Sequence, residues 1–214
     1  MSAAGRLRSL LGTDRLLTVP GCSDALGARL IEQAGFEAAY MTGFGSSATL
    51  LAQPDVGLLT GTEMTANAAR IVAATSVPVL ADSDAGYGNP MNVMHTVRQY
   101  ERAGVAAIQL EDQVSPKRCG HMAGKTVVAT DEMVAKIRSA VDACDEMLVI
   151  ARTDARAPEG IDSAIDRAHA YAAAGADVLF VEALESPAEF ARVAAEGFGI
   201  PLVSNWAKVA ARRR

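Results

Sequence analysis

The fold of this chain can be predicted from one stretch, which reads Ala103-Gly104-Val105-Ala106-Ala107-Ile108-Gln109-Leu110-Glu111-Asp112. Its glycine follows a helical stretch and can supply the left-handed residue that ends a helix. The apolar run after it is continuous, as in parallel strands that are buried on both faces. Alanine–glycine pairs recur at 34–35 and 174–175, so the three glycines lie about 70 residues apart. Each interval has room for two strand–helix units.

Seven apolar runs of this kind predict seven strands, with helical stretches between them. Strands that alternate with helices imply a parallel α/β sheet. The spacing favours a TIM-type (β/α)8 barrel over a doubly wound sheet, because Gly43-Phe44-Gly45 lacks the third glycine of a dinucleotide-binding fingerprint. We predict one α/β domain over residues 1–214, with about seven of the eight barrel strands. The runs are 17–19, 38–41, 77–81, 106–110, 147–151, 178–181 and 200–203.

The bulk composition excludes several classes of function. A net charge of −5 gives no reason to expect nucleic acid or an anionic membrane surface as a partner. No apolar run is long enough to span a membrane. The three cysteines, Cys22, Cys119 and Cys144, are far apart and odd in number, so we expect no disulfide framework and a reducing, cytoplasmic setting. A small molecule is the expected partner.

Charged or polar residues follow the ends of the predicted strands. In parallel barrels the C-terminal ends of the strands meet on one face, where active sites lie. A strand must meet polar residues somewhere, but so many at one end, with acids predominating, predict a functional face. The residues are Thr42, Asp55, Asp82, Asp84, Glu111, Asp112, Arg152, Asp154, Glu182 and Asn205.

Three of these acids predict a metal site. Asp82 and Asp84 are two residues apart, so both would face one side of an extended strand end, with Glu111 near them. Close carboxylates raise each other's pKa values, and a hard cation such as Mg²⁺, or Mn²⁺, relieves the repulsion. The alternatives are a simple Asp-Ser-Asp turn before Gly86 and salt bridges from the aspartates to Arg152.

The run Lys117-Arg118-Cys119-Gly120-His121 places a thiol between cations. Neighbouring positive charge favours the thiolate form of a cysteine, and such a group can exchange a proton near neutral pH. The run equally fits an ordinary basic surface loop. The loop Gly43-Phe44-Gly45-Ser46-Ser47 offers backbone N–H groups that suit a carboxylate.

Four segments together form a specific set: 82–88 (Asp-Ser-Asp-Ala-Gly-Tyr-Gly), 110–113 (Leu-Glu-Asp-Gln), 117–121 (Lys-Arg-Cys-Gly-His) and 151–154 (Ala-Arg-Thr-Asp). With them the chain resembles the isocitrate lyase/phosphoenolpyruvate mutase superfamily along nearly its whole length. The cysteine-containing segment is similar to the carbon–carbon lyase branch, which includes methylisocitrate, isocitrate and dimethylmalate lyases. Phe180 stands where isocitrate lyases typically carry tryptophan, which favours a substrate with an alkyl branch.

The resemblance implies a role for each matching residue. Asp82, Asp84 and Glu111 would hold Mg²⁺ directly or through water, with Asp55 contributing through water. Cys119 would be the general acid that protonates the enolate-like product. The remaining residues would contact the substrate, with Arg152 and His121 also taking part in catalysis: Thr42, Gly43, Phe44, Gly120, His121, Arg152, Glu182 and Asn205.

The activity that the resemblance implies is Mg²⁺-dependent retro-aldol cleavage of a 2-methylisocitrate- or dimethylmalate-type substrate. An oxaloacetate hydrolase or a phosphonomutase of the same superfamily is the first alternative. The second is an inactive remnant, because family chains continue beyond Asn205 with an eighth strand and C-terminal helices that exchange between subunits of homo-oligomers. The tail 206–214 instead ends in three arginines, which predicts a truncated or frameshifted gene product.

Overall fold

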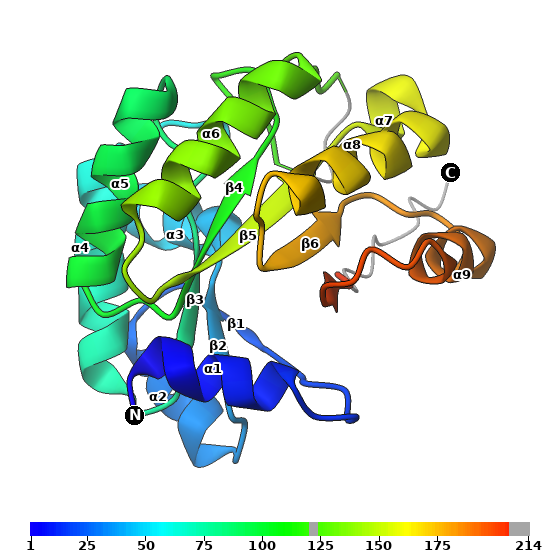
Figure 1. The fold of residues 1–214 in the computed structure, drawn as a ribbon. Helices are drawn as coiled ribbons and strands as arrows, with labels where there is room; N and C mark the ends of the chain where they lie inside the picture. Colours follow the sequence, from blue (N-terminus) through cyan, green and yellow to red (C-terminus); the bar gives the residue numbers. More distant parts are fainter. Residues whose placement is uncertain (120–123, 206–214) are drawn as a thin grey trace, which may run out of the picture.

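The computed structural model describes residues 1–119 and 124–205. In this part of the chain seven parallel strands form one sheet, in sequence order from β1 to β7, and the sheet curls with helices on its outer face (Figure 1). The prediction of an α/β barrel with seven strands is confirmed. The strands are β1 (Gly21–Cys22), β2 (Ala39–Met41), β3 (Val79–Asp82), β4 (Ala107–Glu111), β5 (Leu148–Thr153), β6 (Val178–Val181) and β7 (Leu202–Val203).

The helices lie between the strands, as the sequence predicts. The glycines at 35, 104 and 175 have φ angles of 86°, 85° and 104°, so each adopts the left-handed conformation expected just past a helix. A capping box between Thr60 and Glu63 begins α4. The helices are α1 (Ala3–Leu11), α2 (Ala25–Gln33), α3 (Gly43–Leu51), α4 (Gly61–Ala74), α5 (Pro90–Arg102), α6 (Thr130–Ala143), α7 (Arg156–Glu159), α8 (Ile161–Ala173) and α9 (Pro187–Ala195).

The first strand lies later than predicted. The apolar run 17–19 is not a strand, and β1 is Gly21–Cys22. The Tyr40 N–H donates to the Pro20 carbonyl, so pairing with β2 begins only there. Leu17 and Val19 pack instead against the cluster that includes α1. Their apolar character therefore reflects burial against the end of the sheet and not strand pairing.

Two apolar clusters divide the strand residues by their parity. One cluster packs the outward residues, such as Val79 and Ala81, against the surrounding helices. The other gathers the inward residues, such as Leu80 and Ile150, with Leu7 of α1. Helix α1 therefore closes the end of the sheet where the strands begin (Figure 1). The inner face remains available for polar side chains only near the carboxyl ends of the strands.

Among the described residues, no helix combines the length and the apolar character needed to cross a membrane.

Candidate active site

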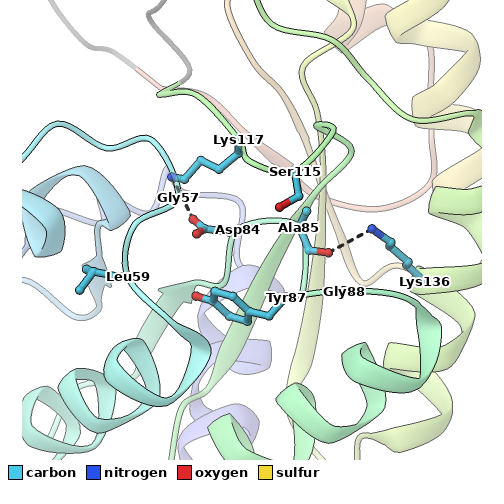
Figure 2. Close-up of a pocket in the computed structure, with 9 residues that line it drawn as sticks. All are labelled: Gly57, Leu59, Asp84, Ala85, Tyr87, Gly88, Ser115, Lys117 and Lys136. Carbon is cyan, nitrogen blue, oxygen red and sulfur yellow. Dashed lines mark hydrogen bonds and ion pairs between the residues drawn. The ribbon is translucent and has the colours of Figure 1, made fainter.

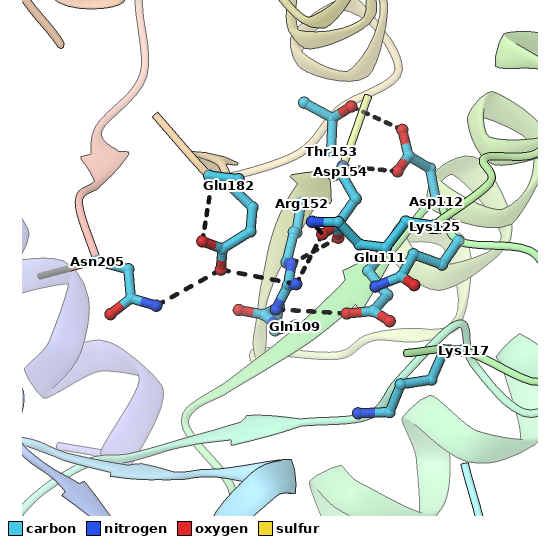
Figure 3. Close-up of polar contacts among 12 residues, drawn as sticks. Gln109, Glu111, Asp112, Lys117, Lys125, Arg152, Thr153, Asp154, Glu182 and Asn205 are labelled. Atoms are coloured by element: carbon cyan, nitrogen blue, oxygen red, sulfur yellow. Dashed lines mark hydrogen bonds and ion pairs between the residues drawn. The ribbon is translucent and has the colours of Figure 1, made fainter. Parts of the chain in front are cut away.

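Among the described residues, five buried charged or amide side chains lie on the inner face of the sheet because of the two-residue period of a strand. Asp82 follows the inward Leu80 by two residues, and Arg152 follows the inward Ile150 in the same way. The register aligns Glu111 with Arg152 and Asp82 with Gln109 on neighbouring strands. Short parallel strands thus bring together groups that are far apart in sequence (Figure 3). The five are Asp82, Gln109, Glu111, Arg152 and Glu182, all buried.

Asp55, Asp82, Asp84 and Lys117 form what we call the acid cluster. The Lys117 ammonium lies 2.6 Å from a carboxylate oxygen of Asp55 and 2.9 Å from Asp84 Oδ1. All four residues are buried. The cation that neutralises these acids in the protein alone is therefore Lys117, and not Arg152 as the salt-bridge alternative proposed. From sequence alone Lys117 is only a neighbour of the thiol, because a buried lysine in a loop cannot be distinguished from a solvated one by its neighbours in sequence.

Asp84 does not continue the strand, so the reasoning from an extended strand end is wrong. Strand β3 ends at Asp82, and Asp84 has a φ of 48°, in the left-handed region. The Asp84 N–H donates to Asp82 Oδ1 at 3.0 Å, and the Asp84 carbonyl accepts from the Glu111 N–H at 3.0 Å. The Asp-Ser-Asp turn considered from sequence is therefore present, and it still brings both carboxylates into the acid cluster.

The acid cluster strongly perturbs its own ionisation. Burial, the charge of Asp82 and that of Asp55 raise the pKa of Asp84 to about 6, against the opposing effect of Lys117. Burial alone would lower the pKa of Lys117, but Asp82, Asp84, Glu111 and Asp55 together raise it above its usual value. One ammonium thus holds several carboxylates, which keep a surplus of negative charge.

Glu111 supplies a further feature that fits a metal ion. Its Oε1 is buried and has no hydrogen-bond partner among the described residues, an unusual and costly state for a carboxylate oxygen. Burial raises the pKa of Glu111 well above its usual value, although Arg152 opposes this. Hard carboxylate oxygens with surplus negative charge are the donors that Mg²⁺ prefers, and Mg²⁺ often takes only one or two of them with water.

The predicted ligands are not gathered as a finished metal cage. The described chain contains no group of three or more His, Cys, Asp or Glu side chains close enough to hold an ion jointly. The physical reason is that Lys117 pairs with Asp55 and Asp84, while Glu111 Oε2 lies 3.4 Å from Arg152. Asp82, Asp84, Glu111 and Asp55 fit a divalent ion by their chemistry, and their role as ligands stays a prediction.

Arg152, Glu111, Asp154, Glu182 and Lys125 form what we call the arginine cluster (Figure 3). Asp154 accepts from both Arg152 Nε (2.8 Å) and Arg152 Nη2 (2.9 Å), and also from Lys125 Nζ at 2.7 Å. Arg152 lies 3.6 Å from Glu182, and its guanidinium carbon lies 5.3 Å from the centre of the Phe180 ring. Burial alone would lower the pKa of Arg152, but Asp154, Glu111 and Glu182 raise it, so the side chain stays charged.

A buried hydrogen-bond network around Asp112 contacts the backbone and side chains next to Arg152. The Asp112 carboxylate accepts from the Thr153 hydroxyl (2.7 Å), the Asp154 N–H (2.8 Å) and the Tyr171 hydroxyl (2.7 Å). Arg167 lies 3.4 Å from the same carboxylate. The sequence placed Asp112 and Asp154 at the functional face but gave them no role. The structure makes them supports for β5, a role that only tertiary contacts reveal.

The segment expected to bind a carboxylate is the start of a helix and not a loop. Thr42 is the N-cap of α3, and its side chain accepts from the Gly45 N–H. The Gly43 N–H donates to Asp82 Oδ2 at 3.2 Å, so α3 begins at the acid cluster. Phe44 is 58% exposed. The N-terminal N–H groups of a helix attract anions, which retains these residues as candidates for substrate binding.

Two of the remaining predicted residues, Cys119 and Asn205, lie close to the two clusters. Cys119 is half-buried, and its N–H donates to the Asp55 carbonyl at 3.0 Å, so it adjoins the acid cluster. Asn205 Nδ2 lies 3.5 Å from Glu182 Oε2, which brings it to the arginine cluster. Gly120 and His121 lie outside the described residues.

A small cavity of about 70 Å³ lies beside the acid cluster (Figure 2). Asp84 and Lys117 line it together with Tyr87 and Lys136, and Lys136 Nζ donates to the Ala85 carbonyl at 3.3 Å. The cavity lies against Asp84 and Lys117 of the acid cluster, so it adjoins the candidate substrate site on the inner face of the sheet.

Acids and an arginine at the carboxyl ends of parallel strands form the arrangement found on the active face of barrel enzymes. Comparison with known proteins agrees. A family model described as phosphoenolpyruvate phosphomutase matches residues 7–210. The chain is 54% identical over 195 residues to 2,3-dimethylmalate lyase of Eubacterium barkeri, covering 90% of this chain and 68% of that protein. It is 51% identical to probable 2-methylisocitrate lyase 2 of Corynebacterium glutamicum, covering 93% and 65%.

Solved structures give the same result. A crystal structure of 2,3-dimethylmalate lyase matches with a TM-score of 0.91 and 44% identity, covering 94% of this chain and 69% of that one. Oxaloacetate acetylhydrolase in complex with 3,3-difluorooxalacetate matches with a TM-score of 0.91 and 41% identity, covering 94% and 70%. Phosphonopyruvate hydrolase in complex with oxalate and Mg²⁺ matches with a TM-score of 0.86 and 34% identity, covering 94% and 71%.

The chain belongs to the isocitrate lyase/phosphoenolpyruvate mutase superfamily, within its carbon–carbon lyase branch. The resemblance that the four sequence segments carry is thereby confirmed. The chain spans about two thirds of the length of these relatives.

Proposed function

We propose that this protein cleaves a carbon–carbon bond of a 2-hydroxy or alkyl-substituted di- or tricarboxylate, of the 2-methylisocitrate or dimethylmalate type. The observation that carries the proposal is the proximity of the two charged clusters: Glu111 lies 3.4 Å from Arg152 and interacts electrostatically with Asp82 and Lys117. Cys119 adjoins the acid cluster, because its N–H donates to the Asp55 carbonyl. Identities of 54% and 51% to proteins named as dimethylmalate and methylisocitrate lyases support the substrate type.

Retro-aldol cleavage gives each cluster a task. In the proposed reaction a carboxylate of the acid cluster, acting as the base, takes the proton of the substrate hydroxyl, the carbon–carbon bond breaks, and a carbonyl forms on one product. The electron pair of the broken bond stays on the other product, next to a carboxylate, as an enolate-like anion. In this mechanism the Arg152 guanidinium binds substrate carboxylate and offsets the new charge. Cys119 then donates its thiol proton to the carbon that carries the electron pair.

A bound Mg²⁺ or Mn²⁺ would add Lewis-acid stabilisation of the developing oxyanion. Asp82, Asp84 and Glu111 are the residues that we propose hold it, with Asp55 contributing through water. Thr42, Gly43 and Phe44 would bind the carboxylate of the pyruvate-like half at the start of α3. Glu182 and Asn205 would contact the other half. Substrate binding is also proposed for Gly120 and His121, with His121 also catalytic.

Hydrolysis of oxaloacetate is the second candidate, because the oxaloacetate acetylhydrolase structure is as similar by TM-score, 0.91, as that of the lyase. Phosphonomutase chemistry is a third possibility within the superfamily. The products separate these activities. A lyase releases glyoxylate, or pyruvate with a partner acid, whereas a hydrolase releases oxalate and acetate and a mutase forms a carbon–phosphorus compound.

The decisive experiment combines product analysis with a cysteine variant. We expect Cys119→Ala to lower turnover about 10²–10⁴-fold, the usual contribution of a general acid. The melting temperature should still rise on addition of Mg²⁺ with oxalate. Cys144→Ala is the matched control, because that half-buried thiol lies outside the site and its turnover should not change. Unchanged turnover in Cys119→Ala refutes the general-acid role. A wild-type chain that shows no cooperative melt supports an inactive remnant.

The proposal also covers the cellular compartment, the partner and the assembly of the protein. All three cysteines are free, which supports a reducing, cytoplasmic setting. A small carboxylate is the proposed partner, with neither nucleic acid nor a membrane. Assembly into a homo-oligomer is proposed from the resemblance alone, and the mass of the protein in solution tests it.

A further inference from the structure

A buried ion pair joins Asp154, the residue that follows β5, to Lys125 in the connection between β4 and α6. Lys125 Nζ lies 2.7 Å from Asp154 Oδ1, and the two side chains are 1% and 0% exposed. Taking two charges out of water costs free energy that their attraction often fails to recover, so such a pair is weak evidence for a role in stability. Its position beside Arg152 suggests a role in the site.

Asp154 holds the guanidinium of Arg152 in one orientation. Asp154 Oδ2 accepts from Nε and Oδ1 from Nη2, which fixes one edge of the planar group. The other nitrogen, Nη1, lies 3.4 Å from Glu111 Oε2 and so points along the inner face. The Asp154 oxygen that binds Nη2 is the same oxygen that binds Lys125. A change at Lys125 therefore acts directly on the group that orients Arg152.

The charge balance gives Lys125 a second effect on Arg152. Three carboxylates, those of Asp154, Glu111 and Glu182, lie within 3.6 Å of this arginine. With one cation for three acids, the surroundings would repel an incoming substrate carboxylate. Lys125 neutralises part of this charge, so more of the field of Arg152 is available to a ligand. Burial alone would raise the pKa of Asp154, but Arg152 and Lys125 lower it, which keeps the carboxylate charged.

The same connection reaches both clusters. At its base, Gln113 pairs with Val127 as an antiparallel bridge, and the Val114 N–H donates to the Thr126 carbonyl. Lys117 of one arm lies among the acids, and Lys125 of the other arm lies against Asp154. Because the arms share one base, the position of this connection and the orientation of Arg152 are mechanically linked.

We propose that Lys125 is a positioning residue for Arg152, acting through Asp154. Lys125 itself need not touch the substrate. The inference rests on the proposed function only in assuming that Arg152 binds a substrate carboxylate. It predicts that losing the Lys125 cation weakens carboxylate binding without altering the acid cluster.

Oxalate is the probe, and binding is measured by calorimetry in the presence of saturating Mg²⁺. We expect Lys125→Met to weaken oxalate binding about tenfold to a hundredfold. This is the usual loss of affinity when a residue that orients a binding group is removed. Lys125→Arg, which keeps the cation, should recover most of the affinity. The double variant Lys125→Met/Asp154→Asn should bind no more weakly than Asp154→Asn, because the two residues act in series. With substrate, KM should rise more than kcat falls.

Lys136→Met is the matched control, because Lys136 is equally buried but contacts Ala85 and Glu132 and not the arginine cluster. Wild-type oxalate affinity in Lys125→Met, or additive losses in the double variant, would overturn the proposal. If wild-type protein binds no oxalate, the proposed function fails but the coupling is still decided. The denaturant midpoints of Lys125→Met, Arg152→Met and their double variant then measure the coupling. With Asp154 present, the two single losses of stability should not sum to the loss in the double variant. In the Asp154→Asn background they should sum to it. Additive shifts with Asp154 present would overturn the coupling itself.

Discussion

The acid cluster and the arginine cluster lie on either side of β4 and are built in different ways. In the acid cluster, one ammonium serves Asp55 and Asp84, the backbone of Asp84 is left-handed, and burial raises the pKa of that carboxyl to about 6. In the arginine cluster, the Asp154 carboxylate accepts hydrogen bonds from one edge of the Arg152 guanidinium and from a second cation, Lys125. A surplus of charge suits a cluster that takes up a cation. A guanidinium whose one edge is held by the well-paired Asp154 suits a cluster that presents a fixed donor to substrate.

This contrast predicts that the largest single effect comes from Arg152. In Arg152→Met the carboxylates of Asp154, Glu111 and Glu182 lose their shared cation while remaining buried. Removing one partner of a buried pair costs about 3–5 kcal/mol, so the free energy of unfolding should fall by about that amount and turnover should be lost. Urea unfolding and product assays measure both.

Arg152→Lys is the control, because it keeps the charge but loses the planar fork. It should recover stability and leave activity reduced. If Arg152→Met unfolds no more easily than the wild type, the pairs around Arg152 do not stabilise the protein, and the arginine cluster does not hold a fixed donor before substrate binds.

The next effect is expected at Lys117 and should depend on metal. Lys117→Met leaves Asp55 and Asp84 without their ammonium, so the apoprotein should lose about 2 kcal/mol, less than a fully paired network would lose. A divalent cation can replace that charge. The rise in melting temperature on adding MgCl₂ should therefore be larger in Lys117→Met than in the wild type.

Lys136→Met again serves as the control, because Lys136 lines the same small cavity but pairs with none of the site acids (Figure 2). Its melting temperature should respond to MgCl₂ as the wild type does. An equal response in Lys117→Met would mean that the acid cluster does not exchange its ammonium for a metal ion, and the contrast between the clusters would weaken.

The fold could be predicted from the sequence because its signals are local. Continuous apolar runs such as 178–181 coincide with strands, and the glycines at 35, 104 and 175 end helices as expected. The run 17–19 was misassigned because an apolar segment that covers the end of a sheet has the same composition as a strand. Only the pairing partner distinguishes the two.

That the candidate site residues lie near one another could be predicted from the sequence, but their pairings could not. Asp82, Glu111 and Arg152 were recognised because they follow strands, and strand ends converge in any parallel barrel. That Lys117 and not Arg152 neutralises the aspartates could not be predicted, because both cations are compatible with the sequence. The left-handed turn at Asp84 was likewise hidden, since aspartate adopts that conformation only in particular contexts. Interactions across the chain decide these features.

The smallest predicted effect tests the closest approach in the acid cluster, where α3 begins. A Cβ atom added at Gly43 would lie 2.5 Å from Asp82 Oδ2 and 3.4 Å from Lys117 Nζ. Asp82 must therefore rotate in Gly43→Ala and lose the bond from the Gly43 N–H. We expect a loss of about 1 kcal/mol in the free energy of unfolding, the value of one hydrogen bond, and weaker Mg²⁺ binding by calorimetry.

Gly21→Ala is the matched control for this substitution. Gly21 lies on β1, where the nearest atom to an added Cβ is Thr42 Cγ2 at 3.7 Å, an ordinary contact. That variant should bind Mg²⁺ as the wild type does. If Gly43→Ala also keeps the wild-type affinity for Mg²⁺, the Asp82 side chain can rotate without losing the ion. The acid cluster would then be less rigid than the arginine cluster. Such a result would sharpen the contrast, because it would identify the acid cluster as the adaptable half of the site.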